Sequence, residues 1–371
     1  MNHHFNKVKK NFGFGCMRLP MVNGEVDREQ FDKMVDTFIA AGFNYFDTAH
    51  GYLGGKSETA LRASLTSRYP RESYVLTNKL SGNFFNSQED IRPLFQSQLE
   101  ACGVDYFDFY LMHAQGRGNF QHYRSCRAYE TALELKKEGK IRHLGISFHD
   151  TAEYLDMILS TYPEIEVVQI QFNYIDFEDD GVQSRKCYEV CRKHSKPIIV
   201  MEPVKGGSLV SLPDEAGAIL DALGGGSYAS YAIRFAASFG GIEMVLSGMG
   251  NMDMVNDNIS FMKDFKPLSA DERAAIDHAV GFIRSRPLIP CTDCKYCTER
   301  CPKNIPIPAH FSSMNDKIKL NNWRAHYLYG KNTENGGRAC ECIKCGACET
   351  ACPQKLPIRE LLEKISAEFD K

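Results

Sequence analysis

Two short cysteine runs constrain most strongly what this chain can form. The first spans Cys291–Cys301 and reads CTDCKYCTERC, and the second spans Cys342–Cys352 and reads CIKCGACETAC. Each has the spacing C-x2-C-x2-C-x3-C, and a proline follows each final cysteine. Gaps of two residues let one tight loop aim three sulfurs at a single centre, and soft thiolates are ligands that iron prefers. The runs therefore predict two metal centres of the same design.

This spacing, proline included, is the one with which bacterial ferredoxins hold [4Fe–4S] clusters. The fourth cysteine of such a run ligates the other cluster. Two clusters are therefore expected, one on Cys291, Cys294, Cys297 and Cys352 and the other on Cys342, Cys345, Cys348 and Cys301. Zinc knuckles and disulfides are the alternatives, but closed zinc sites pair C-x2-C units rather than run four cysteines together. Cys340 is spare in this register.

Length and charge narrow the class of protein. The 371 residues suit about two domains, and a hydrophobic content of 43% supplies a sizeable core. The net charge of −3, without a basic stripe, argues against binding nucleic acid. No apolar run approaches the roughly 20 residues of a membrane span, and no secretory signal is recognisable. His3 and His4 are interpreted as residues of a flexible end. A long chain with fourteen cysteines and no recognisable secretory signal indicates a reducing compartment, so a cytoplasmic location is expected.

Ahead of the cysteine runs, short apolar runs alternate with segments of helical length. The expected strands are Phe12–Met17, Asn44–Asp47, Tyr74–Lys79, Phe107–His113, His143–Phe148, Val167–Asn173, Pro197–Glu202 and Met244–Gly248. The expected helices are Arg28–Ala41, Ser57–Arg68, Glu89–Cys102, Tyr123–Glu138, Thr151–Ser160, Val182–His194 and Ser227–Ser238, the last capped by Ser227. Eight β/α units over about 250 residues predict an α/β fold, the (β/α)8 TIM barrel. A doubly wound sheet is the rival, but its GxGxxG turn is missing after the first strand.

The expected division is a barrel over residues 1–265, a connecting helix and linker over 266–290, and a dicluster ferredoxin-type domain over 291–371. Ser269 and Glu272 have the spacing of a capping box, which opens a helix expected to reach about Arg286. The interval between the cysteine runs is long for a minimal ferredoxin. The cluster domain is therefore expected to be small and mainly helical, with helices near Ala309–Leu320, Trp323–Tyr329 and Glu360–Phe369.

Polar side chains stand at the ends of three successive predicted strands, where TIM barrels carry their catalytic residues. Asp47 ends the second strand, Lys79 the third and His113 the fourth, and Tyr52 follows Asp47 in the loop. Taken singly, each has an ordinary structural explanation: a turn cap, a solvated strand end or a core histidine. Together, on one face of one barrel, they predict a catalytic site.

Residues 12–260 resemble the aldo-keto reductase family, most closely in GFNYFDTAHGY, FDFYLMH, KIRHLGIS and VVQIQFNY and again in VLSGMGNMDMVNDNI. That family is a TIM barrel that moves hydride between a nicotinamide and a carbonyl. The resemblance implies that Tyr52 is the general acid for the carbonyl oxygen. Lys79, paired with Asp47, is then expected to lower the pKa of Tyr52 from its usual value of about 10. His113 is expected to orient the carbonyl by donating a hydrogen bond.

The resemblance also implies contacts to the cofactor. The matched positions are Ser147 and Gln169 for the nicotinamide carboxamide, Gly248, Met249 and Gly250 for the pyrophosphate, and Asp257 and Asn258 for adenine. The sequence departs from the family pattern at Met201, at Phe148 and at Met254, where an arginine usually binds the 2′-phosphate of NADP. The expected cofactor is therefore NADP or NAD, with Lys205 as a candidate replacement for that arginine.

The combination resembles a subgroup of aldo-keto reductases with a C-terminal ferredoxin-type domain. It favours a cytoplasmic oxidoreductase that acts on a small carbonyl or alcohol with NADP or NAD and carries two [4Fe–4S] clusters. The clusters would exchange electrons with the substrate or with a partner such as a ferredoxin or a flavoprotein. One alternative is a redox-sensing protein that binds nicotinamide without useful turnover. Another is a reductase whose clusters are only structural.

Overall fold

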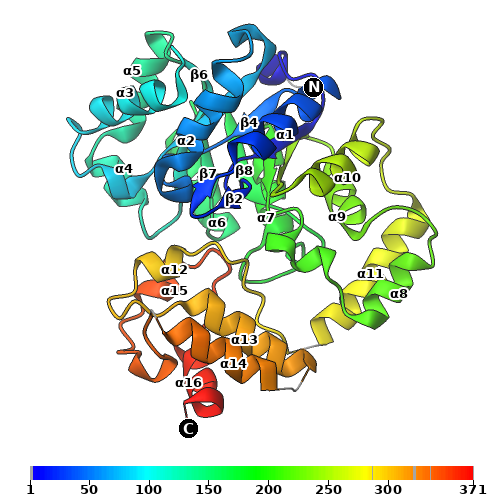
Figure 1. Ribbon diagram of the computed structural model, residues 1–371. Helices are drawn as coiled ribbons and strands as arrows, with labels where there is room; N and C mark the ends of the chain where they lie inside the picture. Colours follow the sequence, from blue (N-terminus) through cyan, green and yellow to red (C-terminus); the bar gives the residue numbers. More distant parts are fainter. Residues whose placement is uncertain (1–2, 286, 321–322, 335, 371) are drawn as a thin grey trace. The chain divides into compact units, whose positions relative to one another are not determined.

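The computed structural model describes residues 3–285, 287–320, 323–334 and 336–370 (Figure 1). The chain forms two compact units, each described by itself. The first consists of Met1–Val204 and Leu223–Ile276, and the second of Lys205–Ala222 and Asp277–Lys371. No helix in the described part of the chain is both long enough and apolar enough to cross a membrane.

Eight parallel strands of the first unit close into a barrel, as the sequence predicts. In chain order they are β1 (Phe12–Gly15), β4 (Tyr45–Asp47), β5 (Val75–Leu80), β6 (Phe107–Gln115), β7 (Ile141–Phe148), β8 (Val167–Gln171), β9 (Ile198–Met201) and β10 (Ile242–Gly248). Pairing of β1 with β10 completes the closure. Parallel strands covered on both faces are buried along most of their length, and β5 is buried at every position although it includes Thr77, Asn78 and Lys79. The strands β2 (Met21–Val22) and β3 (Glu25–Val26) form a separate antiparallel hairpin.

Helices of the first unit surround this barrel (Figure 1). They are α1 (Arg28–Ala40), α2 (Lys56–Leu61), α3 (Ile91–Cys102), α4 (Phe120–Ser125), α5 (Ala128–Lys137), α6 (Ala152–Thr161), α7 (Ser184–Lys193), α9 (Tyr228–Ala237) and α10 (Met252–Met262), with shorter turns η1 (His3–Phe5), η2 (Tyr52–Gly55), η3 (Arg62–Thr66), η4 (Arg71–Ser73) and η5 (Gly82–Phe84). The predicted cap of α9 is confirmed, because the Ser227 hydroxyl accepts a hydrogen bond from the Ser230 backbone N–H at 3.1 Å. The single helix expected over 123–138 is instead α4 and α5, separated by Arg127 with φ 52°.

The segment before β1 covers the end of the barrel at which the strands begin. Phe5 and Val8 are buried in one apolar cluster with barrel residues that include Tyr45, Phe109 and Val167. The ring of Phe5 lies 4.9 Å from that of Phe109. His4 lies in η1, directly beside this buried anchor. The interpretation of this segment as a flexible end is therefore wrong, because Phe5 holds it against the core.

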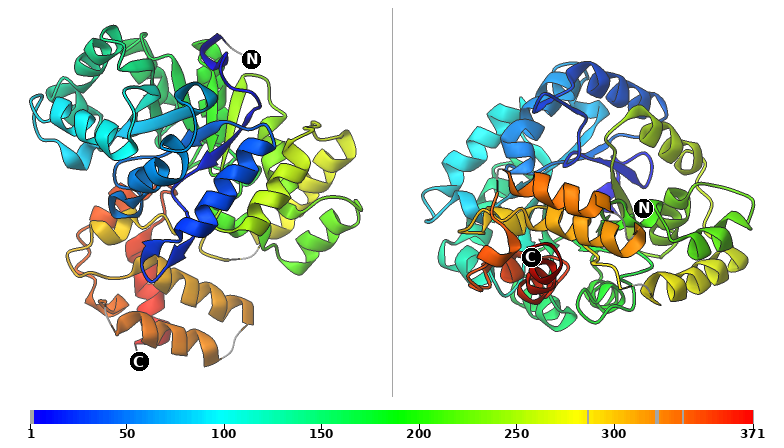
Figure 2. Two further views of the ribbon diagram at one scale, coloured as in Figure 1. Left: turned by 45° about the horizontal axis from the view of Figure 1, so that its top comes forward. Right: turned by 60° about the horizontal axis from the view of Figure 1, so that its bottom comes forward.

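The second unit is mainly helical, as the sequence predicts, and its described residues contain no strand. Its elements are η6 (Lys205–Val210), α8 (Asp214–Asp221), α12 (Tyr296–Glu299), α13 (Ile307–Leu320), α14 (Trp323–Thr333), η7 (Ala339–Glu341), α15 (Ala347–Ala351) and α16 (Ile358–Phe369). Helices α13 and α14 lie side by side, and α16 packs against α13 (Figure 2). Phe311, Tyr329 and Leu362 are buried in their shared core.

The helix that leads from the first unit into the second begins as predicted. The Ser269 N–H donates to the Glu272 carboxylate at 2.7 Å, and the Glu272 N–H donates to the Ser269 hydroxyl at 3.2 Å. This capping box opens α11 (Ala270–Ser285). Arg286, to which the predicted helix extends, lies outside the described residues.

Residues 205–222 leave the barrel after β9 and form η6 and α8 within the second unit. Gly206 has a φ of +65°, and a Cβ there would lie 2.6 Å from the backbone carbonyl oxygen of Thr292. Beside it, the buried Lys205 donates from Nζ to Gln354 Oε1 at 2.7 Å. The segment therefore packs on residues that adjoin both cysteine runs. The expected division into domains at residues 265 and 290 stays a prediction. It assigned residues 205–222 to the barrel.

Replacing Gly206 with alanine is expected to destabilise the second unit. The left-handed backbone costs an alanine about 1–2 kcal/mol, and the contact with Thr292 adds an overpacking cost of about 1–3 kcal/mol. Gly207→Ala is the matched control, because Gly207 lies in the same unit and has a φ of +100° but open space around its Cβ position. The measurement is the urea midpoint for loss of visible absorbance under anaerobic conditions. Equal shifts in the two variants would show that the close contact with Thr292 contributes nothing.

Candidate functional site

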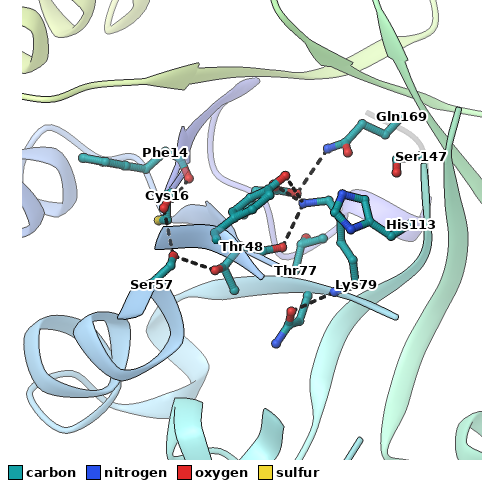
Figure 3. Close-up of polar contacts among 12 residues, drawn as sticks. Phe14, Cys16, Thr48, Ser57, Thr77, Lys79, His113, Ser147 and Gln169 are labelled. Carbon is teal, nitrogen blue, oxygen red and sulfur yellow. Dashed lines mark hydrogen bonds and ion pairs between the residues drawn. The ribbon is translucent and has the colours of Figure 1, made fainter. Parts of the chain in front are cut away.

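The buried ammonium of Lys79 organises the predicted catalytic residues at the end of the barrel where the strands finish (Figure 3). Its Nζ donates to Asp47 Oδ1 at 2.5 Å and to the Thr48 carbonyl oxygen at 2.8 Å. The Tyr52 hydroxyl lies 3.3 Å from the same nitrogen. Strands β4 and β5 are neighbours in the barrel, which brings Asp47 and Lys79 together, and η2 returns Tyr52 to them. The structure thus brings together three side chains that the sequence singled out.

His113 joins this group from β6. Its ring lies 5.9 Å from the ring of Tyr52, at 75° to it. The Ser81 hydroxyl and His113 Nδ1 are hydrogen-bonded at 2.6 Å, which fixes the orientation of the imidazole. Sequence reasoning missed Ser81. Its signal was the strand alternation, since Ser81 lies two residues after Lys79 and so points to the same side of the chain.

Burial dominates the electrostatics of the site. It raises the pKa of the Asp47 carboxyl and lowers that of the Lys79 ammonium, while the attraction between the two charges opposes both shifts. Burial, followed by the charge of Asp47, raises the pKa of Tyr52 well above its usual value. Burial, with Lys79 and His149 nearby, lowers the pKa of His113 well below its usual value. At neutral pH, Tyr52 therefore keeps its proton and the His113 imidazole is uncharged.

The direction for Tyr52 is opposite to the one expected from the sequence. Lys79 was expected to lower the pKa of the phenol, but its charge is matched by Asp47 at 2.5 Å. A neutralised ion pair has little remaining field with which to favour a phenolate, so the cost of burial prevails. A tyrosine that holds its proton at neutral pH is suited to donate it.

Two of the predicted nicotinamide contacts lie in the same site (Figure 3). Gln169 in β8 donates from Nε2 to Asp47 Oδ2 at 3.2 Å, and the Ser147 hydroxyl in β7 accepts from the Ala114 N–H at 2.7 Å. Gln171, the last residue of β8, has a buried amide nitrogen that makes no hydrogen bond within the described residues, although its Oε1 contacts His149 Nδ1 at 3.1 Å. A buried unpaired donor is costly, so this amide nitrogen fits a site that receives a polar ligand.

The predicted pyrophosphate turn follows β10. Gly248, Met249 and Gly250 lead to Asn251, whose side chain caps α10 by accepting from the Met254 N–H at 2.9 Å. Gly248 lies against the Arg18 side chain, since a Cβ there would be 3.4 Å from Arg18 Cδ. A helix N-terminus beside an arginine fits a diphosphate. Sequence reasoning missed Arg18, because β1 and β10 meet only when the barrel closes.

The other residues predicted to contact the cofactor form hydrogen bonds with side chains of the protein itself. Asp257 accepts from the Ser227 hydroxyl at 2.7 Å, and the buried Asn258 donates to the Ser247 hydroxyl at 3.0 Å. Their contact with adenine stays a prediction. Lys205, the candidate replacement for the phosphate-binding arginine, instead donates to Gln354 within the second unit.

The eight cysteines of the two runs line two separate cavities in the second unit. The sulfur-bearing residues of the first cavity are Cys291, Cys294, Cys297 and Cys352, and those of the second are Cys301, Cys342, Cys345 and Cys348. This is the crossed arrangement that the spacing predicts. No disulfide joins the cysteines of the described residues, the exposed Cys340 among them, so the disulfide alternative is wrong there. Burial raises the pKa of Cys297 to about 12 and that of Cys348 to about 11, so these sulfurs ionise readily only beside a cation.

The two cysteine runs share a backbone conformation as well as a cysteine spacing. Asp293 and Lys344 occupy equivalent places in the two runs and have φ of 53° and 58°. Two residues later, Lys295 and Gly346 have φ of 66° and 78°, and each precedes a short helix, α12 or α15. Left-handed residues at fixed intervals curl each run around one centre, and non-glycine residues there carry a conformational cost. Four convergent thiols in an otherwise largely apolar cavity fit a [4Fe–4S] cluster.

Comparisons with known proteins identify both parts of the chain. Residues 11–280 match the aldo/keto reductase family, and residues 290–356 match a 4Fe-4S dicluster domain. The NADH-specific methylglyoxal reductase of Escherichia coli K12 is 30% identical over 210 residues, which is 51% of this chain and 61% of that protein. An aldo-keto reductase of Mycolicibacterium vanbaalenii is 29% identical over 271 residues, 71% of this chain and 88% of that protein.

Solved structures show the same barrel. The aldo-keto reductase from Klebsiella pneumoniae in complex with NADPH has a TM-score of 0.60 at 22% identity, covering 72% of this chain and 90% of its own. A likeness at this identity establishes the fold, and the family match over residues 11–280 establishes the ancestry. The chain belongs to the aldo/keto reductase family, and is an oxidoreductase of that type with a 4Fe-4S dicluster domain after its barrel.

Proposed function

We propose that this protein interconverts a small-molecule carbonyl and its alcohol with NADP or NAD, using Tyr52 as general acid and base. The observation that carries the proposal is the Lys79 ammonium, which contacts both Asp47 and the Tyr52 hydroxyl inside the barrel. The raised pKa of Tyr52 keeps the phenol protonated at neutral pH, ready for a carbonyl oxygen.

Each side chain then has a defined task. Tyr52 gives its proton to the carbonyl oxygen, and Lys79 stabilises the phenolate that remains by donating to it across a contact of 3.3 Å. Asp47 holds Lys79 in place, and Gln169 in turn donates to Asp47. His113, uncharged and oriented by Ser81, can donate a second hydrogen bond to the same oxygen. A nicotinamide, when bound, supplies or accepts the hydride at carbon.

The residues that would hold this nicotinamide cofactor are those matched from the family, together with two found in the structure. Gln171 offers its buried amide nitrogen, and Arg18 stands beside the Gly248–Gly250 turn. One related protein is named as NADH-specific and one structural neighbour holds NADPH, so both cofactors are candidates. Anaerobic oxidation of NADH and NADPH against a panel of small aldehydes and ketones tests the proposal. Tight binding of a nicotinamide with no turnover of any carbonyl would favour a redox sensor instead.

We also propose that the cysteine cavities hold two [4Fe–4S] clusters, which exchange electrons with a separate partner such as a ferredoxin or a flavoprotein. Nicotinamide chemistry moves electrons in pairs, whereas each cluster takes one. Flavin is a common cofactor for joining these two kinds of chemistry. The electron partner is therefore expected to carry a group that can divide the pair.

Mixing the flavin-free protein with NADH or NADPH alone is expected to leave the clusters oxidised on the time scale of turnover. Visible absorbance and EPR under anaerobic conditions are the measurements. Addition of dithionite serves as the control that the clusters are reducible. Prompt bleaching by nicotinamide, with neither flavin nor partner protein present, would contradict this prediction and indicate a direct internal path. Resistance to every reductant would indicate purely structural clusters.

A further inference from the structure

A second group of potential ligands lies in the first unit, away from the catalytic residues. His4 comes from η1, His143 from the early part of β7, and Glu166 from the residue before β8. They therefore gather at the end of the barrel where strands begin, opposite the end that carries Asp47 and Lys79. All three side chains are mostly buried, with exposed fractions of 15%, 23% and 17%.

The three facing atoms form a nearly equilateral triangle. His4 Nδ1 lies 3.2 Å from His143 Nδ1 and 3.3 Å from Glu166 Oε1, and His143 Nδ1 lies 3.2 Å from the same oxygen. Zinc binds imidazole nitrogen and carboxylate oxygen at about 2.0–2.1 Å in tetrahedral geometry. Two ligands of such an ion are about 3.3 Å apart, which is the edge of this triangle.

Hydrogen bonds account for this triangle poorly. A neutral imidazole carries one proton, and an ionised carboxylate carries none, so at most two protons can serve the three contacts. If both Nδ1 atoms are protonated and donate to Glu166, two N–H groups face each other across 3.2 Å. A cation at the centre accepts a lone pair from all three atoms at once.

The residues around Glu166 orient its carboxylate, as outer residues do around the ligands of a metal ion. The second oxygen of Glu166 accepts from the Leu144 N–H at 2.9 Å and from Lys136, which orients the carboxylate and leaves Oε1 toward the histidines. Metal binding needs an ionised carboxylate, and the Lys136 ammonium paired with Glu166 favours that form.

We propose that His4, His143 and Glu166 bind one Zn²⁺ ion through Nδ1, Nδ1 and Oε1, with water in the fourth position. Two imidazoles and one carboxylate form a ligand set suited to zinc rather than to magnesium or calcium, which prefer oxygen alone. The ion fastens the segment at residues 3–8 to strands β7 and β8. It is independent of the thiolate sites in the second unit.

Metal analysis of the anaerobic holoprotein tests the proposal. After exposure to Zn²⁺ and removal of the excess, wild-type protein is expected to retain about one zinc more per chain than His143→Ala at equal iron content. The matched control is His194→Ala, because His194 also pairs with a carboxylate, Asp156 at 2.6 Å, and has an exposed fraction of 19%, but no second histidine among the described residues joins it. His4→Ala, changed in a segment outside the barrel strands, should lose the same zinc even if His143→Ala folds poorly.

X-ray absorption at the zinc edge distinguishes this site from zinc held by cysteines. Nitrogen and oxygen at about 2.0–2.1 Å, without sulfur at about 2.3 Å, is the expected first shell. Zn²⁺ should also raise Tm of wild type and of His194→Ala by several degrees, but not that of His4→Ala. Equal zinc retention in all four proteins, or a first shell of sulfur, would overturn the proposal.

Discussion

Replacing Tyr52 with phenylalanine is expected to lower kcat by at least about 10²-fold, the lower end of what general acid catalysis contributes. The phenyl ring can fill the same space beside His113, so the site keeps its shape while losing the proton donor. Because the proton moves only in the transition state, kcat and kcat/KM should fall together and nicotinamide affinity should stay the same. Steady-state kinetics with the best carbonyl substrate, together with a fluorescence titration of the nicotinamide, provide both values.

Tyr188→Phe is the control for this prediction. Tyr188 lies on α7 outside the barrel, and its hydroxyl donates to the Gly240 carbonyl oxygen at 2.8 Å. That variant loses a hydroxyl from the same type of ring but should turn over normally. Retention of full activity by Tyr52→Phe would remove Tyr52 from the mechanism and leave His113 as the proton donor to be tested next.

Cys301→Ser is expected to reduce the iron content from about eight atoms per chain to about four, with loss of the cluster held by the other cysteine run. Cys301 belongs to the first run in sequence, but it lines the cavity of Cys342, Cys345 and Cys348. The neighbouring Cys340→Ser is the control, since Cys340 is exposed and lines neither cavity. Iron analysis and EPR of the dithionite-reduced protein give the count.

Double variants show which cluster has been lost. If the ligation is crossed, Cys301→Ser combined with Cys345→Ser should lose no more iron than either alone, because both changes affect one cluster. Cys301→Ser combined with Cys294→Ser should remove nearly all iron. The reverse pattern would establish that each run holds its own cluster, and equal zinc content in place of iron would remove the ferredoxin interpretation.

The barrel could be predicted because its strands can be recognised from local sequence patterns. Runs such as Ile198–Met201 are apolar throughout, since parallel strands are covered on both faces. The predicted catalytic group also followed from sequence, because strands of one barrel end at one face and place Asp47, Lys79 and His113 together. The cysteine spacing predicted two sets of four sulfurs for the same reason: local spacing and one repeated backbone shape determine both.

Features that depend on distant pairs could not be predicted. His4 and His143 are 139 residues apart in the chain, and nothing in either neighbourhood marks them as partners. Whether the pKa of Tyr52 is raised or lowered depends on how completely the charge of Asp47 cancels that of Lys79. That balance depends on the distance between the two groups, which the sequence does not give. Arg18 was missed because a lone arginine carries no pattern, and only the closed barrel shows that it lies beside Gly248.

The route of residues 205–222 has a consequence for how the protein is made. This segment is synthesised before the rest of its unit, residues 277–371, and at usual rates of translation the delay is on the order of 10 s. During that time Lys205 and Gly206 lack Gln354 and Thr292, which they contact in the finished protein. A nascent chain therefore carries residues 205–222 without the rest of their unit while residues 223–276 are being made. Completion of the second unit therefore waits until the barrel residues and the rest of the chain have been synthesised.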